Sequence, residues 1–277
     1  MDLDAALDRL AADPSASMDV AEISLLLARD EYRDLDVRAD LNRLGDLACQ
    51  ARPFLARNAP CDLERRVAGL SQFLFDELRF RGHVQDYYDA DNSYLNRVLD
   101  RRLGLPITLS IVTMAVAARA DLTVHGIGLP GHFVVKAVDG GQEVLFDPFH
   151  GGQVLSPCDC EQLVQQVTGR SFAATPNNLQ PLPLGLLARR LLTNLKSVYI
   201  RQGDFIRAIR TIGRIRQLAP NDVMERRDLG ICYVHAGQPG RAIDLLSDYL
   251  EETPDGPDAA KVGQMLKKAE VEVARWN

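Results

Sequence analysis

One histidine and one aspartate in the middle of the chain have the spacing of a catalytic pair. His132 follows the turn-forming Pro130-Gly131 and begins an apolar run, and Asp147 ends the next apolar run. If the two runs are adjacent antiparallel strands, the carboxylate can reach the imidazole. Such a contact orients a histidine and holds it in one tautomer, as a general base requires. The pair therefore suggests acid–base chemistry, which still needs a nucleophile.

Two hydroxyl side chains, Thr108 and Ser110, are the candidate nucleophiles. Both lie near the start of an apolar segment that predicts a buried helix over 107–119. A histidine base can activate a hydroxyl, so either residue could act with His132 and Asp147 in a hydrolase or acyltransferase. Alternatively, the hydroxyls could hydrogen-bond to helix carbonyls, and the histidine–aspartate pair could be purely structural.

Polar, aromatic and turn residues near these segments are candidates for the rim of a binding cleft. They are Asn92, Tyr94, Asn96, Pro130, Gly131 and His150. His150 could also join His132 and Asp147 around a metal ion, but the spacing matches no standard zinc signature. We therefore expect neither a metal nor another cofactor.

The elements that must position these residues follow from hydrophobic periodicity and turn signals. Apolar runs predict strands over 123–129, 132–138 and 143–146, with Asp139-Gly140-Gly141 as a hairpin turn. A helix is expected to begin near Asn92 or Ser93. The first eighty residues have helical spacing throughout. The buried helix and the antiparallel strands thus form an α+β core.

The C-terminal third contains an internal repeat with a period of 34 residues. The recurring pairs are Leu195/Leu229, Tyr199/Tyr233, Gly203/Gly237, Ala208/Ala242 and Pro220/Pro254. This pattern is typical of tetratricopeptide repeats. It predicts two repeats over 189–256 and a capping helix over 258–276. We therefore expect three regions: a helical N-terminal unit over 1–84, the core over 85–180 and a repeat region over 181–277.

Composition excludes several functional classes. The chain has 277 residues and a net charge of -6, with 46% hydrophobic and 25% charged residues. The charge argues against a nucleic-acid partner, and the lack of a long apolar run argues against a membrane span. The cysteines are odd in number and irregularly spaced, which favours reduced thiols and a cytoplasmic location. They are Cys49, Cys61, Cys158, Cys160 and Cys232.

Several motifs together resemble a known family. They are Asn92-Ser93-Tyr94-Leu95-Asn96, Gly104-Leu105-Pro106-Ile107-Thr108-Leu109-Ser110, Gly128-Leu129-Pro130-Gly131-His132-Phe133 and Asp147-Pro148-Phe149. The chain resembles the bacterial SirB-type proteins, which join a transglutaminase-like, or papain-like, core to C-terminal tetratricopeptide repeats. The resemblance implies an α+β core between two helical parts.

The resemblance also implies roles for individual residues. The wider superfamily uses a Cys–His–Asp triad with the cysteine at the start of the buried helix, and His132 and Asp147 match two of its members. The cysteine position falls near Pro106 or Ile107, so the nucleophile is missing. We therefore predict a non-catalytic or weakly catalytic protein, a pseudoenzyme that binds another protein or a peptide through the cleft and the repeats. The hydrolase or acyltransferase is the alternative.

Overall fold

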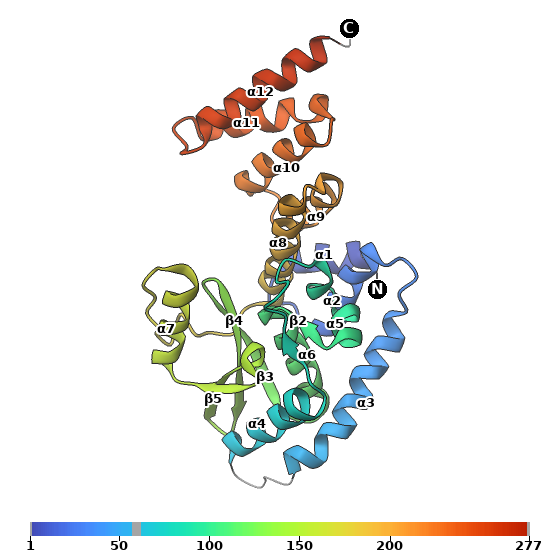
Figure 1. Cartoon of the computed structure of the whole chain (residues 1–277), viewed down its shortest axis with the longest axis vertical. Coiled ribbons are helices and arrows are strands. Elements are labelled where there is room, and N and C mark those ends of the chain that lie inside the picture. The colour runs from blue at the N-terminus through green and yellow to red at the C-terminus, as the bar shows by residue number, and fades with distance from the viewer. Residues whose placement is uncertain (1, 57–61, 276–277) are drawn as a thin grey trace. The chain divides into compact units, whose positions relative to one another are not determined.

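The computed structural model describes residues 2–56 and 62–275 (Figure 1). Its backbone separates into two compact units. The first comprises the chain up to Ala6 together with Pro14–Ala188, and the second comprises Leu7–Asp13 and the chain from Arg189 onward. The mixed architecture confirms the predicted α+β fold class with a C-terminal helical region.

Helices account for most of the N-terminal region, as the hydrophobic spacing predicts. The α-helices up to residue 168 are α1 (Leu3–Ala12), α2 (Val20–Glu31), α3 (Val37–Ala56), α4 (Leu63–Ser71), α5 (Leu95–Arg101), α6 (Pro106–Arg119) and α7 (Pro157–Thr168). Helix α4 continues into a π-helical segment, Gln72–Glu77. Asp19 caps α2 by accepting a hydrogen bond from the Ala21 N–H.

A four-stranded antiparallel sheet forms the centre of the first unit. Its strands are adjacent in chain order: β3 (Thr123–Leu129), β4 (His132–Asp139), β5 (Gln142–Asp147) and β6 (Gln153–Leu155). The first three confirm the predicted strands to within one or two residues. The short strand β6 was not predicted, and neither was a parallel pair formed by β1 (Arg81–Gly82) and β2 (Leu103–Gly104).

Helix α6 is the buried helix expected from the sequence. Every residue from Pro106 to Ala117 is buried, and the helix contacts β3, β4 and α3 (Figure 1). A helix that is apolar all round is stable only inside a core, because any exposed face would leave apolar surface in water. The start of α6 therefore lies deep within the first unit.

Helix α5 begins later than the sequence suggested. Its N-cap is Tyr94, and neither Asn92 nor Ser93 caps it. Residues Ala90–Asn92 instead form a separate 3₁₀ turn, which the side chain of Asp89 caps. The Asn92 side chain is already used, since its amide donates to the backbone carbonyl of Asp86 at 2.7 Å.

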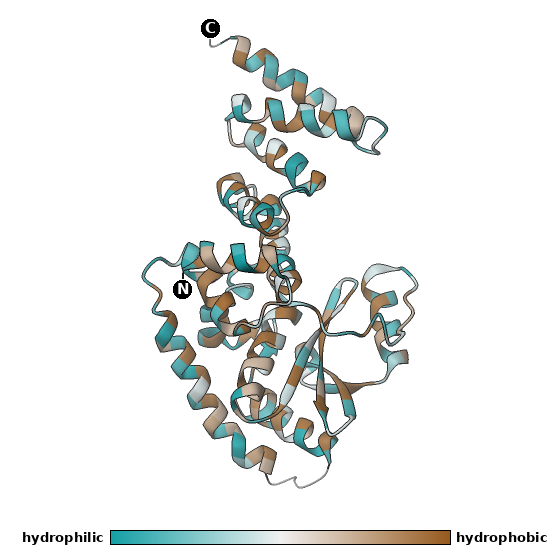
Figure 2. Cartoon of the chain, turned by 180° about the vertical axis from the view of Figure 1, so that it is seen from behind, coloured by the Kyte–Doolittle hydropathy of each residue, from teal (hydrophilic) through white to brown (hydrophobic). Residues whose placement is uncertain are grey.

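The second unit is helical. Its helices are α8 (Leu184–Gln202), which starts in the first unit, and α9 (Phe205–Leu218), α10 (Val223–His235), α11 (Ile243–Glu252) and α12 (Ala259–Ala274). Equivalent repeat positions have equivalent environments: Ala208 and Ala242 are both fully buried, and Gly203 and Gly237 both adopt positive φ after a helix. Apolar and polar residues alternate along these helices (Figure 2). Position 276 of the expected capping helix lies outside the described residues.

None of the helices within residues 2–56 and 62–275 combines the length and the hydropathy needed to cross a membrane.

Candidate functional site

The predicted histidine–aspartate pair meets at one end of the sheet. His132 is the first residue of β4 and Asp147 is the last residue of β5, so the antiparallel pairing of these strands brings the two side chains together. His132 Nε2 lies 2.8 Å from Asp147 Oδ2. Both side chains are buried, with exposed fractions of 5% and 1%.

A second histidine contacts the same carboxylate oxygen. His150 Nδ1 lies 2.7 Å from Asp147 Oδ2, while Asp147 Oδ1 accepts a hydrogen bond from the Phe149 N–H at 2.9 Å. Asp147 thereby caps the 3₁₀ turn Pro148–His150, which carries the second histidine back over the pair. The rings of His132 and His150 stack with their centroids 5.7 Å apart.

These contacts keep the Asp147 carboxylate ionised. Burial raises its pKa, but the hydrogen bonds from His132 and then His150 outweigh burial and hold the pKa well below its usual range. The hydrogen bond to Asp147 also raises the pKa of His150 against the opposing effect of its partial burial. The centre is therefore a buried anion held by two imidazoles.

The two candidate nucleophiles occupy the start of α6, and both are fully buried. Thr108 Oγ1 accepts a hydrogen bond from the Leu105 N–H at 2.9 Å and donates one to the Asn92 carbonyl at 2.8 Å. Ser110 Oγ has no hydrogen-bond partner among the described residues. Neither hydroxyl is thus hydrogen-bonded to the His132 ring within the described part of the chain.

Three of the predicted rim residues lie in the core, which corrects their assignment to a cleft rim. Asn92, Tyr94 and Asn96 have exposed fractions of only 0%, 4% and 8%. Asn92 Oδ1 lies 3.0 Å from His83 Nδ1, and the Tyr94 ring packs edge-on against Tyr32. The polar side chain of Asn92 makes internal hydrogen bonds, and the motif does not mark a surface.

The other predicted rim residues are more accessible. Pro130 and Gly131 are exposed in the turn between β3 and β4, where Gly131 adopts a positive φ of 71°. This backbone conformation favours glycine. The side chain of His150 is 50% exposed.

A cavity of about 210 Å³ opens beside the carboxylate. Asp147 and His150 contribute to its wall, and α7 supplies much of the rest. Its other lining residues are Gln153, Leu155, Asp159, Gln162, Leu163 and Gln166. The α7 residues of this wall were not predicted as site residues. Gln162 and Gln166 are four residues apart, and this spacing puts both side chains on one face of a helix.

Phe149 is a further site residue that the sequence analysis did not single out. Its ring lies edge-on to His132, with the centroids 5.9 Å apart, and to His150, with the centroids 5.2 Å apart. It also lines a second cavity, of about 330 Å³, together with Phe75, Arg79 and Arg81.

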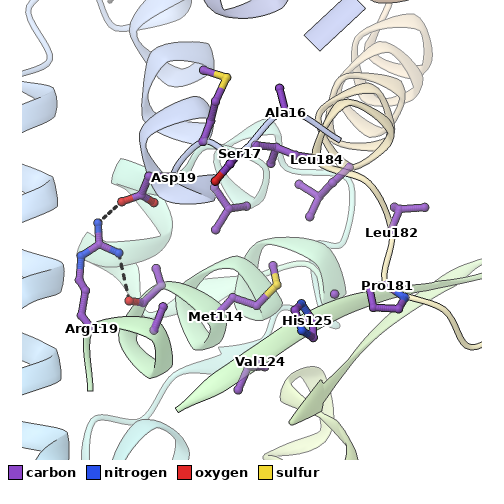
Figure 3. Close-up of a pocket in the computed structure, with 16 residues that line it drawn as sticks. Ala16, Ser17, Asp19, Met114, Arg119, Val124, His125, Pro181, Leu182 and Leu184 are labelled. Atoms are coloured by element: carbon purple, nitrogen blue, oxygen red, sulfur yellow. Dashed lines mark hydrogen bonds and ion pairs between the residues drawn. The ribbon is translucent and has the colours of Figure 1, made fainter. Parts of the chain in front are cut away.

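A third cavity, of about 540 Å³, lies away from these residues, between the segment before α2, helix α6, strand β3 and the start of α8 (Figure 3). Its walls are mainly apolar, with Met114, Leu182 and Leu184 among them. An ion pair between Arg119 and Asp19 closes one side, and Arg119 also donates to the Ala115 carbonyl at 3.1 Å. The cavity contains none of the predicted site residues.

The fold and the repeats agree with two family models. Residues 36–193 match the model of the transglutaminase-like superfamily, and residues 195–267 match a tetratricopeptide-repeat model. The chain therefore belongs to the transglutaminase-like superfamily and carries C-terminal tetratricopeptide repeats, which confirms the predicted combination.

Among individual proteins, the chain is similar to bacterial UPF0162 proteins. It is 34% identical to the UPF0162 protein of Xylella fastidiosa strain Temecula1 over 89% of this chain and 88% of that protein. The UPF0162 protein of Haemophilus influenzae is 25% identical, over 90% of this chain and 91% of that protein. Human F-box only protein 21 is 26% identical over 61% of this chain and 30% of its own length.

Proposed function

We propose that the chain is a protein-binding protein whose transglutaminase-like core has lost its cysteine nucleophile. One observation carries this proposal: the start of α6 has no cysteine, and its hydroxyl side chains are buried. Pro106 and Ile107 stand where the superfamily resemblance puts the cysteine, and the nearest hydroxyls, on Thr108 and Ser110, are fully buried without a hydrogen bond to His132.

The alternative hydrolase or acyltransferase needs a hydroxyl that the His132 base can deprotonate. General-base catalysis requires the two groups within hydrogen-bond reach, directly or through one water molecule. The Thr108 hydroxyl is occupied by the backbone N–H of Leu105, the N-cap of α6, and Ser110 lies one turn inside an apolar helix. These positions favour binding over catalysis.

The repeats supply the second part of the proposal. Tetratricopeptide repeats form extended surfaces that bind proteins or peptides. Exposed apolar side chains on the repeat helices, such as Ile206 and Met224, are available for such contacts, with exposed fractions of 61% and 48%. The same proposal includes a cytoplasmic location, which the free thiols of the four described cysteines support.

A covalent probe tests the loss of catalysis. The purified full-length chain would be treated with a fluorophosphonate, which labels activated hydroxyl nucleophiles, and analysed by mass spectrometry. We expect no labelling that depends on His132. Labelling of Ser110 or Thr108 that disappears in His132→Ala would establish the hydrolase or acyltransferase instead.

A peptide selection tests binding. Peptides selected from a random library against the full-length chain would be titrated by fluorescence anisotropy. We expect Ile206→Glu to weaken binding at least tenfold. The matched control is Val167→Glu, which alters another exposed apolar side chain, on α7 and 51% exposed, and should leave the affinity unchanged. Equal affinities for the wild type and Ile206→Glu would contradict a binding role for this repeat face.

A further inference from the structure

Three side chains that commonly ligate metals converge at the end of the sheet. His132, Asp147 and His150 each offer one ligand atom, and these three atoms lie within 4.8 Å of one another. Among the described residues, this is the one group of three histidine, cysteine or acidic side chains whose ligand atoms meet in this way. The three residues come from the start of β4, the end of β5 and the 3₁₀ turn that follows.

The carboxylate is oriented for a shared ligand. Asp147 Oδ1 is occupied by the Phe149 N–H, so Oδ2 is the oxygen that faces both imidazoles. Backbone hydrogen bonds of this kind fix a metal-ligating carboxylate in other proteins. The turn that supplies the hydrogen bond also carries His150, so both ligands are held by the same local structure.

The distances suit a small ion after a slight opening. A first-row transition metal lies about 2.0–2.2 Å from nitrogen and oxygen ligands, so its ligand atoms are about 3 Å apart. The two nitrogen–oxygen separations are 2.8 and 2.7 Å. Binding an ion in place of the hydrogen-bonding protons would widen these two separations and bring the ligand atoms of the two histidines to a similar spacing, which a movement of the half-exposed His150 ring allows.

The site is accessible from the α7 side. Asp147 and His150 line the cavity of about 210 Å³, and its wall also contains the polar residues Gln153, Asp159 and Gln162. An ion can therefore enter through this cavity, and its remaining coordination positions would face a polar space that can hold water or a ligand group.

We propose that His132, Asp147 and His150 form a binding site for a divalent transition-metal ion such as Zn²⁺, Fe²⁺ or Mn²⁺. Two imidazoles and one carboxylate make a ligand set that suits these ions. Calcium and magnesium prefer more oxygen ligands than the three residues offer. The sequence had predicted no metal ion at these three residues. The proposed metal site does not depend on the proposed protein-binding function.

Calorimetry tests the site on the full-length protein. The chain would be stripped of metal with a chelator, dialysed and titrated with Zn²⁺. We expect one ion per chain and at least a tenfold loss of affinity in His150→Ala, whose side chain is exposed enough to be removed without unfolding the protein. His125→Ala is the control, because His125 is an exposed histidine outside the cluster, and it should bind like the wild type.

Cobalt provides a second readout, because the absorption spectrum of bound Co²⁺ reports its ligands. We expect bands typical of nitrogen and oxygen ligands, lost in His150→Ala. Strong sulfur-to-metal charge-transfer bands would place the ion on a cysteine and overturn the proposal. Failure to bind, or equal binding by His150→Ala and the wild type, would also overturn it. Circular dichroism of each variant would show that a loss of binding is not a loss of folding.

Discussion

Gly82 and Phe149 are in direct contact: a methyl group added to Gly82 would lie 2.5 Å from Cε2 of the Phe149 ring. The same ring lies edge-on to both His132 and His150. The short strand β1 therefore packs against the aromatic ring that contacts both histidines. Because Gly82 has no side chain, it leaves room for the Phe149 ring.

The Gly82–Phe149 contact predicts that Gly82→Ala is destabilising. The added methyl group must displace the half-buried ring of Phe149, and overpacking costs about 1–3 kcal/mol. Urea unfolding would measure the loss. Gly45→Ala is the matched control: Gly45 lies within α3 with no atom near its would-be methyl group, so this change should stabilise the protein by about 0.5–1 kcal/mol. An unchanged unfolding midpoint for Gly82→Ala would show that Phe149 moves freely.

Asp91 should make stability depend on pH in the acid range. Burial raises its pKa, but the hydrogen bond from Tyr32, at 2.5 Å, and the ion pair with Arg97 outweigh burial and lower the pKa below 3.8. The stabilisation is therefore present above pH 3.8 and is lost as the pH falls through the pKa of the folded state.

The test of this pH dependence compares the wild type with Asp91→Asn in urea. At pH 7 the substitution should cost about 1.5–3 kcal/mol, the usual value for hydrogen bonds to a charged group. The difference should shrink as the pH falls below 3.8. The exposed Asp34 provides the control substitution, Asp34→Asn. A cost that is constant over the whole pH range would rule out the ionised carboxylate as its source.

Thiol reactivity should separate the cysteines into two classes. Cys49 and Cys158 are exposed, whereas Cys160 and Cys232 are buried. Burial raises the pKa of each of these two thiols to about 11. A protonated, buried thiol does not react with alkylating agents. Iodoacetamide at pH 8 should modify Cys49 and Cys158 quickly and the other two only after denaturation, as read by mass spectrometry. Rapid labelling of Cys160 in the folded protein would contradict this assignment.

Lys196 should be essential to the stability of the second unit. Its ammonium group is buried and lies 2.7 Å from Glu225 Oε1 and 2.9 Å from Asp228 Oδ2. Asp228 would keep its ion pair with Arg227, but Lys196→Met would leave the buried Glu225 carboxylate unpaired, which costs about 3–5 kcal/mol. Thermal unfolding of the full-length chain, followed by circular dichroism, would detect the change.

Two comparisons distinguish lost pairing from lost packing at Lys196. Adding Glu225→Met to Lys196→Met removes the unpaired charge and should recover part of the stability. Lys268→Met removes an exposed lysine whose side chain is 68% accessible, and it should change stability by less than about 0.5 kcal/mol. If the double variant is less stable than Lys196→Met, charge pairing is not the cause.

The sequence by itself determined the strands of the core and the parts of this protein that repeat. Strands β3, β4 and β5 were predicted because buried strands need runs of apolar side chains and the turns between them need residues such as glycine. The repeats were predicted because each one must present the same small and aromatic residues to its neighbour, as Ala208 and Ala242 do. The contact between His132 and Asp147 could also be predicted, since the two residues lie on consecutive strands joined by a hairpin turn.

Only the tertiary structure decided what these residues contact. It brought His150 onto the same carboxylate oxygen as His132, and it buried Asn92 and Asn96, whose polarity had suggested a surface. It also paired β1 with β2 and placed Gly82 in contact with the Phe149 ring. The pairing of β1 with β2 and the contact of Gly82 with Phe149 join segments far apart in the chain. A local pattern does not record which distant residue a side chain will contact.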